Sequence, residues 1–83
     1  MPPNLPYDVI VYSTPLCAPC ERLKRYLADQ GVQFKVKDLM MDEAAAELME
    51  RHNIRTSPAL QVGDEIIAGK DLNPERIDAL IGL

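Results

Sequence analysis

The sequence is poor in the residues from which several classes of protein are built. Its 83 residues include two cysteines, one histidine and no tryptophan. A disulfide between two cysteines so close together cannot cross-link distant segments, which excludes a small secreted module stapled by disulfides. Zinc usually takes four ligands. Cys17, Cys20 and His52 supply three at most, so we expect no metal site.

Long apolar runs and an excess of positive charge are also missing. No apolar stretch approaches the roughly 18 residues that a membrane helix needs. Residues 1–6 have neither the basic start nor the apolar centre of a secretion signal. The net charge is −4, with both signs spread along the chain, and a basic stripe for nucleic acid is absent. We expect a soluble, cytoplasmic protein that binds neither membranes nor nucleic acid.

The hydrophobic content is sufficient for a protein core without disulfides. Hydrophobic residues make up 47% of the chain, a normal share for a globular protein. The length allows one domain and leaves no room for a second. We therefore expect residues 1–83 to form a single domain, with a monomer as the default state.

Hydrophobic periodicity divides the chain into seven elements. Val9 to Tyr12 form an unbroken apolar run, typical of a central strand covered on both faces. Apolar and polar residues alternate in residues 32–37, which predicts a strand with one solvent-exposed face near a sheet edge. The expected strands are residues 7–12, 32–37, 59–62 and 65–67, with a loop at 68–71. The expected helices are residues 17–30, residues 43–52 and a last helix that Asn73 and Pro74 open. The order βαβαββα indicates an α/β fold whose first two strands are parallel.

The two cysteines lie where the first helix begins. Cys17 and Cys20 are separated by Ala18 and Pro19, a spacing that lets them form and break a small disulfide ring. The unpaired N–H groups and the dipole of a helix N-terminus stabilise a thiolate, so the pKa of Cys17 should fall below the value of about 8.5 for free cysteine. We expect Cys17 to be the exposed nucleophile and Cys20 the buried thiol that resolves the mixed disulfide. Two unrelated core thiols, or half of a metal site, are the alternatives.

Three correctly placed motifs make the chain resemble the glutaredoxin branch of the thioredoxin-fold family. They are the Cys-x-x-Cys pair after the first strand, Thr56-x-Pro58 before the third, and the glycine loop of residues 68–71 after the fourth. The resemblance covers nearly the whole chain. It implies a thioredoxin-like (glutaredoxin) fold, with a four-stranded mixed sheet flanked by three helices, and thiol-disulfide oxidoreductase activity.

The resemblance also implies the roles of several binding residues. Pro58 should be cis and lie beside the sulfurs, while the backbone of Ser57 pairs with glutathione or a substrate peptide, as in strand addition. Gly69 and Asp71 correspond to the loop that holds the γ-glutamyl end of glutathione. Lys70 is a candidate partner for a substrate carboxylate, with a solvated surface lysine as the alternative.

Two departures from the glutaredoxin pattern concern the reductant. Thr14 stands where glutaredoxins usually carry a lysine or arginine that helps to bind glutathione, and Pro19 replaces a common tyrosine. Both changes resemble the NrdH-redoxins, which a flavoprotein thioredoxin reductase recharges.

Three functions follow from this reading. The first is a dithiol oxidoreductase that acts on disulfide-containing proteins and glutathione mixed disulfides, with glutathione as co-substrate and no bound cofactor. The second is an NrdH-like electron donor, for example to ribonucleotide reductase. An iron–sulfur cluster carrier ranks third.

Overall fold

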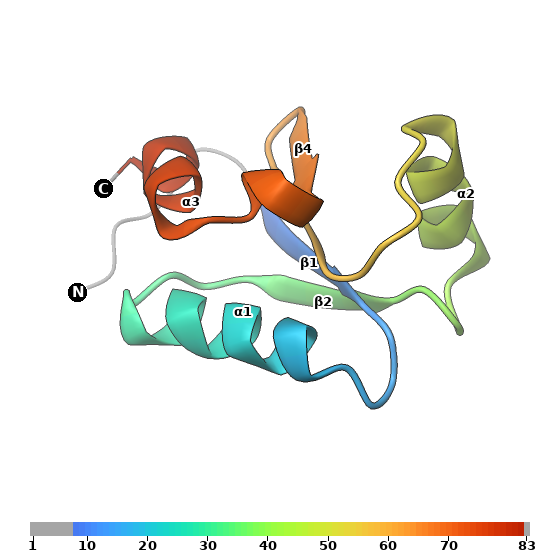
Figure 1. Ribbon diagram of the computed structural model, residues 1–83, viewed down its shortest axis with the longest axis horizontal. Coiled ribbons are helices and arrows are strands. Elements are labelled where there is room, and N and C mark those ends of the chain that lie inside the picture. Colours follow the sequence, from blue (N-terminus) through green and yellow to red (C-terminus); the bar gives the residue numbers. More distant parts are fainter. Residues whose placement is uncertain (1–7, 83) are drawn as a thin grey trace.

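The described part of the chain forms one mixed sheet of four strands with helices on both faces (Figure 1). The computed structural model describes residues 8–82. Its strands are β1 (Val9–Ser13), β2 (Lys35–Asp38), β3 (Ala59–Val62) and β4 (Glu65–Ala68). Its helices are α1 (Ala18–Asp29), α2 (Glu43–Arg51) and α3 (Pro74–Ile81), with a 3₁₀ turn η1 (Gly69–Asp71). The predicted order βαβαββα is confirmed; Tyr7, the expected first residue of the first strand, lies outside the described residues.

The strand order is β2-β1-β3-β4. β1 pairs with β2 in parallel, whereas β1–β3 and β3–β4 are antiparallel. β1 is therefore central and β2 lies at an edge, as the apolar run and the alternating pattern predict. The parallel pair requires a crossover, which α1 supplies.

Alternate side chains of β1 build two separate cores. Val9 and Val11 pack with α1 and α3, through residues such as Leu27 and Ile77. Tyr12 packs on the opposite face with Ala45 and Met49 of α2. Because successive side chains of a strand point to opposite faces, the apolar residues of β1 contribute to both cores, although Ile10 is only partly buried. Figure 1 shows the result, with α1 and α3 on one side of the sheet and α2 on the other.

Polar caps set the starts of the second and third helices. The Asp42 carboxylate accepts from the Ala45 N–H at 3.0 Å, and the Asn73 side-chain oxygen accepts from the Arg76 N–H at 2.9 Å. Each bond satisfies a backbone donor that the helix itself leaves unpaired. The caps thus confirm the helix starts expected from sequence.

The second strand is shorter and later than its alternating pattern predicts. β2 begins at Lys35, so Val32 and Phe34 pack against the core from the loop that precedes it. Val36 lies within β2 yet remains 47% exposed. An edge strand has a neighbour on one side only, which leaves this side chain incompletely covered.

The glycine segment after β4 is not an irregular loop throughout. Ala68 ends β4, and residues 69–71 form the turn η1. Gly69 has φ +60°, a left-handed conformation that glycine adopts without the steric cost of a Cβ. The glycine therefore allows the chain to leave the sheet and enter α3 through a tight turn.

Candidate active site

The turn between β1 and α1 presents the two sulfurs at a helix start. Cys17 is the N-cap of α1, and its sulfur accepts the Cys20 backbone N–H at 3.1 Å. The two cysteines form a disulfide, with Cα atoms 5.2 Å apart. Cys17 is half-buried, whereas Cys20 has 0% exposure. The geometry offers one accessible sulfur, placed where helix N–H groups stabilise negative charge.

The loop before β3 brings a cis proline and two hydroxyls to this turn. The Ser57–Pro58 peptide bond is cis, as the resemblance implies. The Ser57 Oγ atom lies 3.8 Å from the Cys17 sulfur. The Thr14 Oγ1 atom lies 3.0 Å from the Ser57 Oγ. Thr14, Ser57 and Cys17 thus form one contact chain, although 43 residues separate Thr14 from Ser57.

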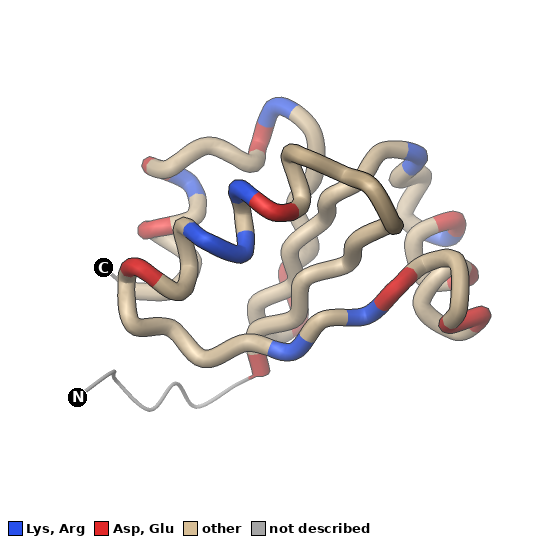
Figure 2. Tube along the Cα trace, turned by 90° about the horizontal axis from the view of Figure 1, so that it is seen from below, with Lys and Arg blue, Asp and Glu red and all other residues tan. Residues whose placement is uncertain are grey.

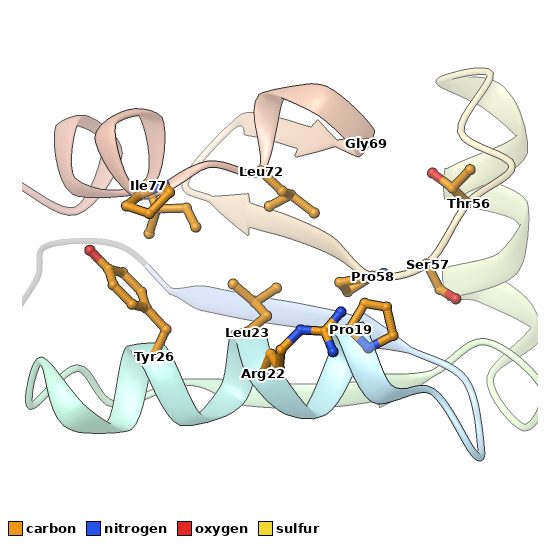
Figure 3. Close-up of a pocket in the computed structure, with 11 residues that line it drawn as sticks. Pro19, Arg22, Leu23, Tyr26, Thr56, Ser57, Pro58, Gly69, Leu72 and Ile77 are labelled. Atoms are coloured by element: carbon orange, nitrogen blue, oxygen red, sulfur yellow. The ribbon is translucent and has the colours of Figure 1, made fainter.

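A groove of about 520 Å³ runs from this loop between α1 and α3 (Figure 3). Its volume lies within the range of about 300–1,000 Å³ usual for ligand sites. Arg22 is the charged side chain among its lining residues. The apolar walls come from Pro19, Leu23, Pro58, Leu72 and Ile77. The groove can therefore take apolar groups of a substrate beside the sulfurs, with a cation at its edge.

A hydrogen bond between two helices borders the groove. The Tyr26 hydroxyl, on α1, donates to the Asp78 carboxylate of α3 at 2.6 Å. The bond to this carboxylate raises the pKa of Tyr26 above its ordinary value. It ties together the two helices that form the groove walls.

A second hollow is lined by three residues predicted to bind glutathione or substrate. Thr56, Gly69 and Asp71 line it together with His52 and Arg55, and its volume is about 440 Å³. Thr56 and Gly69 also line the groove, so the two hollows adjoin. Lys70 is exposed and lines neither hollow. Residues of the segment between α2 and β3, of β4 and of η1 meet here.

The groove walls were not identified as a site from the sequence. Leu23 and Ile77 appear there only as members of helical apolar stripes, and Arg22 as one charge among many. Their shared function as a wall depends on α1 and α3 lying on the same face of the sheet. No local pattern carries that information.

Charge is unevenly distributed around the molecule. Figure 2 shows basic residues along α1, which borders the groove, and mostly acidic residues along α2. Arg22 forms no ion pair within the described part of the chain, whereas Lys24 pairs with Glu21 at 2.6 Å. The groove edge therefore carries a positive charge that is free to meet an anionic group.

Residues 8–82 contain neither a cluster of metal-ligating side chains nor a membrane-spanning helix. No group of three or more His, Cys, Asp or Glu side chains in this range is arranged to hold a metal ion. None of the helices in this range combines the length and apolar character of a membrane span.

The fold, with paired cysteines at the start of α1 beside a cis proline, defines a thiol-disulfide oxidoreductase of thioredoxin-like architecture. The family model for glutaredoxin matches residues 9–67. The chain belongs to the glutaredoxin family.

Three known proteins illustrate the range of this similarity. The Gene 56 protein of Mycobacterium phage D29 is 29% identical over 88% of this chain and 81% of its own length. Glutaredoxin from Brucella melitensis is 35% identical, with a TM-score of 0.68, and the match covers 89% of this chain and 87% of that glutaredoxin. NrdH-redoxin from Escherichia coli is 25% identical, with a TM-score of 0.78, and the match covers 88% of this chain and 93% of that redoxin. Both branches considered from the sequence are thus represented among its structural neighbours.

Proposed function

We propose that this protein is a cytoplasmic dithiol reductase of protein disulfides and of mixed disulfides with glutathione. Cys17 acts as the nucleophile and Cys20 as the resolving thiol. The observation that carries the proposal is their unequal exposure at one helix start, with Cys17 half-buried and Cys20 fully buried. A thiolate must reach the substrate disulfide to attack it. Only the Cys17 sulfur has that access.

The proposed cycle moves two electrons through two exchanges. The Cys17 thiolate attacks one sulfur of the substrate disulfide, which forms a mixed disulfide and releases the other sulfur as a thiolate. Cys20, once deprotonated, then attacks the Cys17 sulfur, which frees the second substrate thiolate and leaves the Cys17–Cys20 disulfide. The substrate has been reduced and the protein oxidised, with no metal or organic cofactor required.

Glutathione is the proposed co-substrate that restores the dithiol. Two glutathione molecules supply two electrons and leave as glutathione disulfide. The hollow lined by Thr56, Gly69 and Asp71 supports this assignment because it shares Thr56 and Gly69 with the groove, which Ser57 and Pro58 also line. The cytoplasmic location belongs to the same proposal, since the glutathione and thioredoxin systems keep thiols reduced there.

A second candidate is an NrdH-like donor that a flavoprotein thioredoxin reductase recharges and that passes electrons on, for example to ribonucleotide reductase. Thr14 favours it, because its hydroxyl contacts Ser57 and supplies no charge for a glutathione carboxylate. The similarity to NrdH-redoxin from Escherichia coli, a glutaredoxin-like protein described by its thioredoxin-like activity profile, also favours it.

A coupled assay of NADPH consumption tests both candidates. The oxidised protein is supplied once with glutathione and glutathione reductase, and once with thioredoxin reductase, with insulin as the protein disulfide. Cys17→Ser serves as the control for background reduction. Turnover that requires glutathione supports the first candidate, and turnover with thioredoxin reductase alone supports the second. Failure of both systems to reduce insulin through the protein would contradict the proposed reductase function.

A further inference from the structure

Two hydroxyl groups form a line of contacts that ends at the Cys17 sulfur. Ser57 Oγ is 3.8 Å from the Cys17 sulfur and 3.0 Å from Thr14 Oγ1. Within residues 8–82, no lysine or arginine side chain forms a hydrogen bond with the Cys17 sulfur, whose other hydrogen-bond partner is the Cys20 N–H. These hydroxyls are therefore the side-chain donors available to the sulfur.

Once the disulfide is reduced, the two hydroxyl protons can be arranged so that Thr14 donates to Ser57 and Ser57 donates to the Cys17 sulfur. Each hydroxyl has one proton and can also accept. If Ser57 donates to Cys17, its oxygen is free to accept the proton of Thr14. A thiolate is a stronger acceptor than a disulfide sulfur, so reduction favours this direction and shortens the contact between Ser57 and Cys17. A second hydroxyl that donates to the first polarises it further.

We propose that Thr14 and Ser57 form a hydroxyl chain that donates a hydrogen bond to the reduced Cys17 sulfur and holds its negative charge. Ser57 touches the reacting atom, and Thr14 is a positioning residue that orients the Ser57 proton. The hydroxyl chain adds to the stabilisation that the backbone N–H groups at the start of α1 give to the Cys17 thiolate. It replaces a stabilising cation without adding charge to the site. This inference rests on the proposed role of Cys17 as the nucleophile.

Charged and titratable groups of several elements bear on the hydroxyl chain, and His52, Arg55 and Asp71 line the hollow that adjoins it at Thr56. Arg22 of α1 lines the groove with Ser57. Tyr26, further along α1, is engaged with Asp78 of α3. Asp38 of β2 lies opposite Ser13 in the sheet, and its carboxylate accepts the Met40 N–H. The test must therefore separate the effect of the hydroxyls from the long-range effect of Arg22.

The test is the pH dependence of iodoacetamide alkylation at Cys17 in the reduced full-length protein. Mass spectrometry quantifies the label at each cysteine. A hydrogen bond to a charged group is worth about 1.5–3 kcal/mol, so Ser57→Ala should raise the alkylation midpoint by roughly one to two pH units. Thr14→Val should raise it by less. The double variant should exceed Ser57→Ala only slightly, because Thr14 acts through Ser57.

Three control variants make the result specific to the hydroxyls. Ser57→Thr keeps the hydroxyl and should retain the native midpoint. Gln33→Ala removes an exposed polar side chain that lines neither the groove nor the second hollow and should leave the profile unchanged. Arg22→Gln measures the long-range charge effect, which should be weaker in high salt, whereas the Ser57→Ala shift should persist.

An unchanged midpoint in Ser57→Ala would overturn the proposal, as would a shift that Ser57→Thr reproduces. Circular dichroism of each variant verifies the fold. Since alkylation needs no disulfide substrate or reductase, its outcome is distinguishable from failure of the proposed reductase function. Preferential labelling of Cys20 in the native protein would instead refute the role assigned to Cys17.

Discussion

Replacing Thr14 by lysine should increase the use of glutathione. Ser57 lies between Thr14 and Cys17: its Oγ atom is 3.0 Å from Thr14 Oγ1 and 3.8 Å from the Cys17 sulfur. A lysine side chain is several bonds longer than threonine. Its ammonium group can therefore pass Ser57 and reach a carboxylate of glutathione bound near the Cys17 sulfur.

The size of the effect follows from the exposure of this position. A hydrogen bond assisted by charge contributes about 1.5–3 kcal/mol when well formed. Thr14 is only half-buried, so solvent screening reduces that contribution to about 1–1.5 kcal/mol. At about 1.4 kcal/mol per factor of ten, kcat/KM for glutathione should rise roughly five- to twelvefold.

The assay is glutathione-dependent reduction of a mixed disulfide, measured in low salt and again in high salt. Thr14→Gln is the matched control, because glutamine is long and polar but uncharged. The lysine variant should exceed both the native protein and Thr14→Gln, and the difference should shrink in high salt. An equal gain in both variants would show that length, not charge, matters. No gain in the lysine variant, together with efficient recharging of the native protein by thioredoxin reductase, would favour the NrdH-like function.

Three further predictions concern the sulfurs, the groove and the core. Cys17→Ser should abolish thiol-disulfide exchange, whereas Cys20→Ser should still attack and accumulate a mixed disulfide at Cys17, which mass spectrometry would detect. Arg22→Glu should lower kcat/KM for an acidic protein disulfide by roughly two- to tenfold in low salt and affect a small neutral disulfide less; equal losses for both would contradict a role in recognising charge. Leu27→Ala, at a side chain with 0% exposure, should lower the free energy of unfolding by about 2–5 kcal/mol in a urea titration. The control Met41→Ala, at 82% exposure, should change it by less than about 0.5 kcal/mol.

Local chemistry explains why much of the fold was predictable from sequence. The apolar run in β1 requires cover on both faces, and α1, α2 and α3 supply it. Asp42 and Asn73 are good N-caps, so the sequence places the starts of α2 and α3 correctly. The pattern misplaced β2, because Val32 and Phe34 reach the core from a loop and the periodicity of buried residues does not require strand pairing.

The sequence alone determined that Cys17 and Cys20 lie at a helix start, since a Cys-x-x-Cys spacing and a helix N-terminus are both local features. Only the tertiary structure decided what surrounds them. The contact between Thr14 and Ser57 spans 43 residues, and the groove joins α1 to α3 across one face of the sheet. Such neighbours depend on how the sheet orders its strands and which face each helix covers. The packing of the whole chain sets that arrangement, so no short stretch of sequence encodes it.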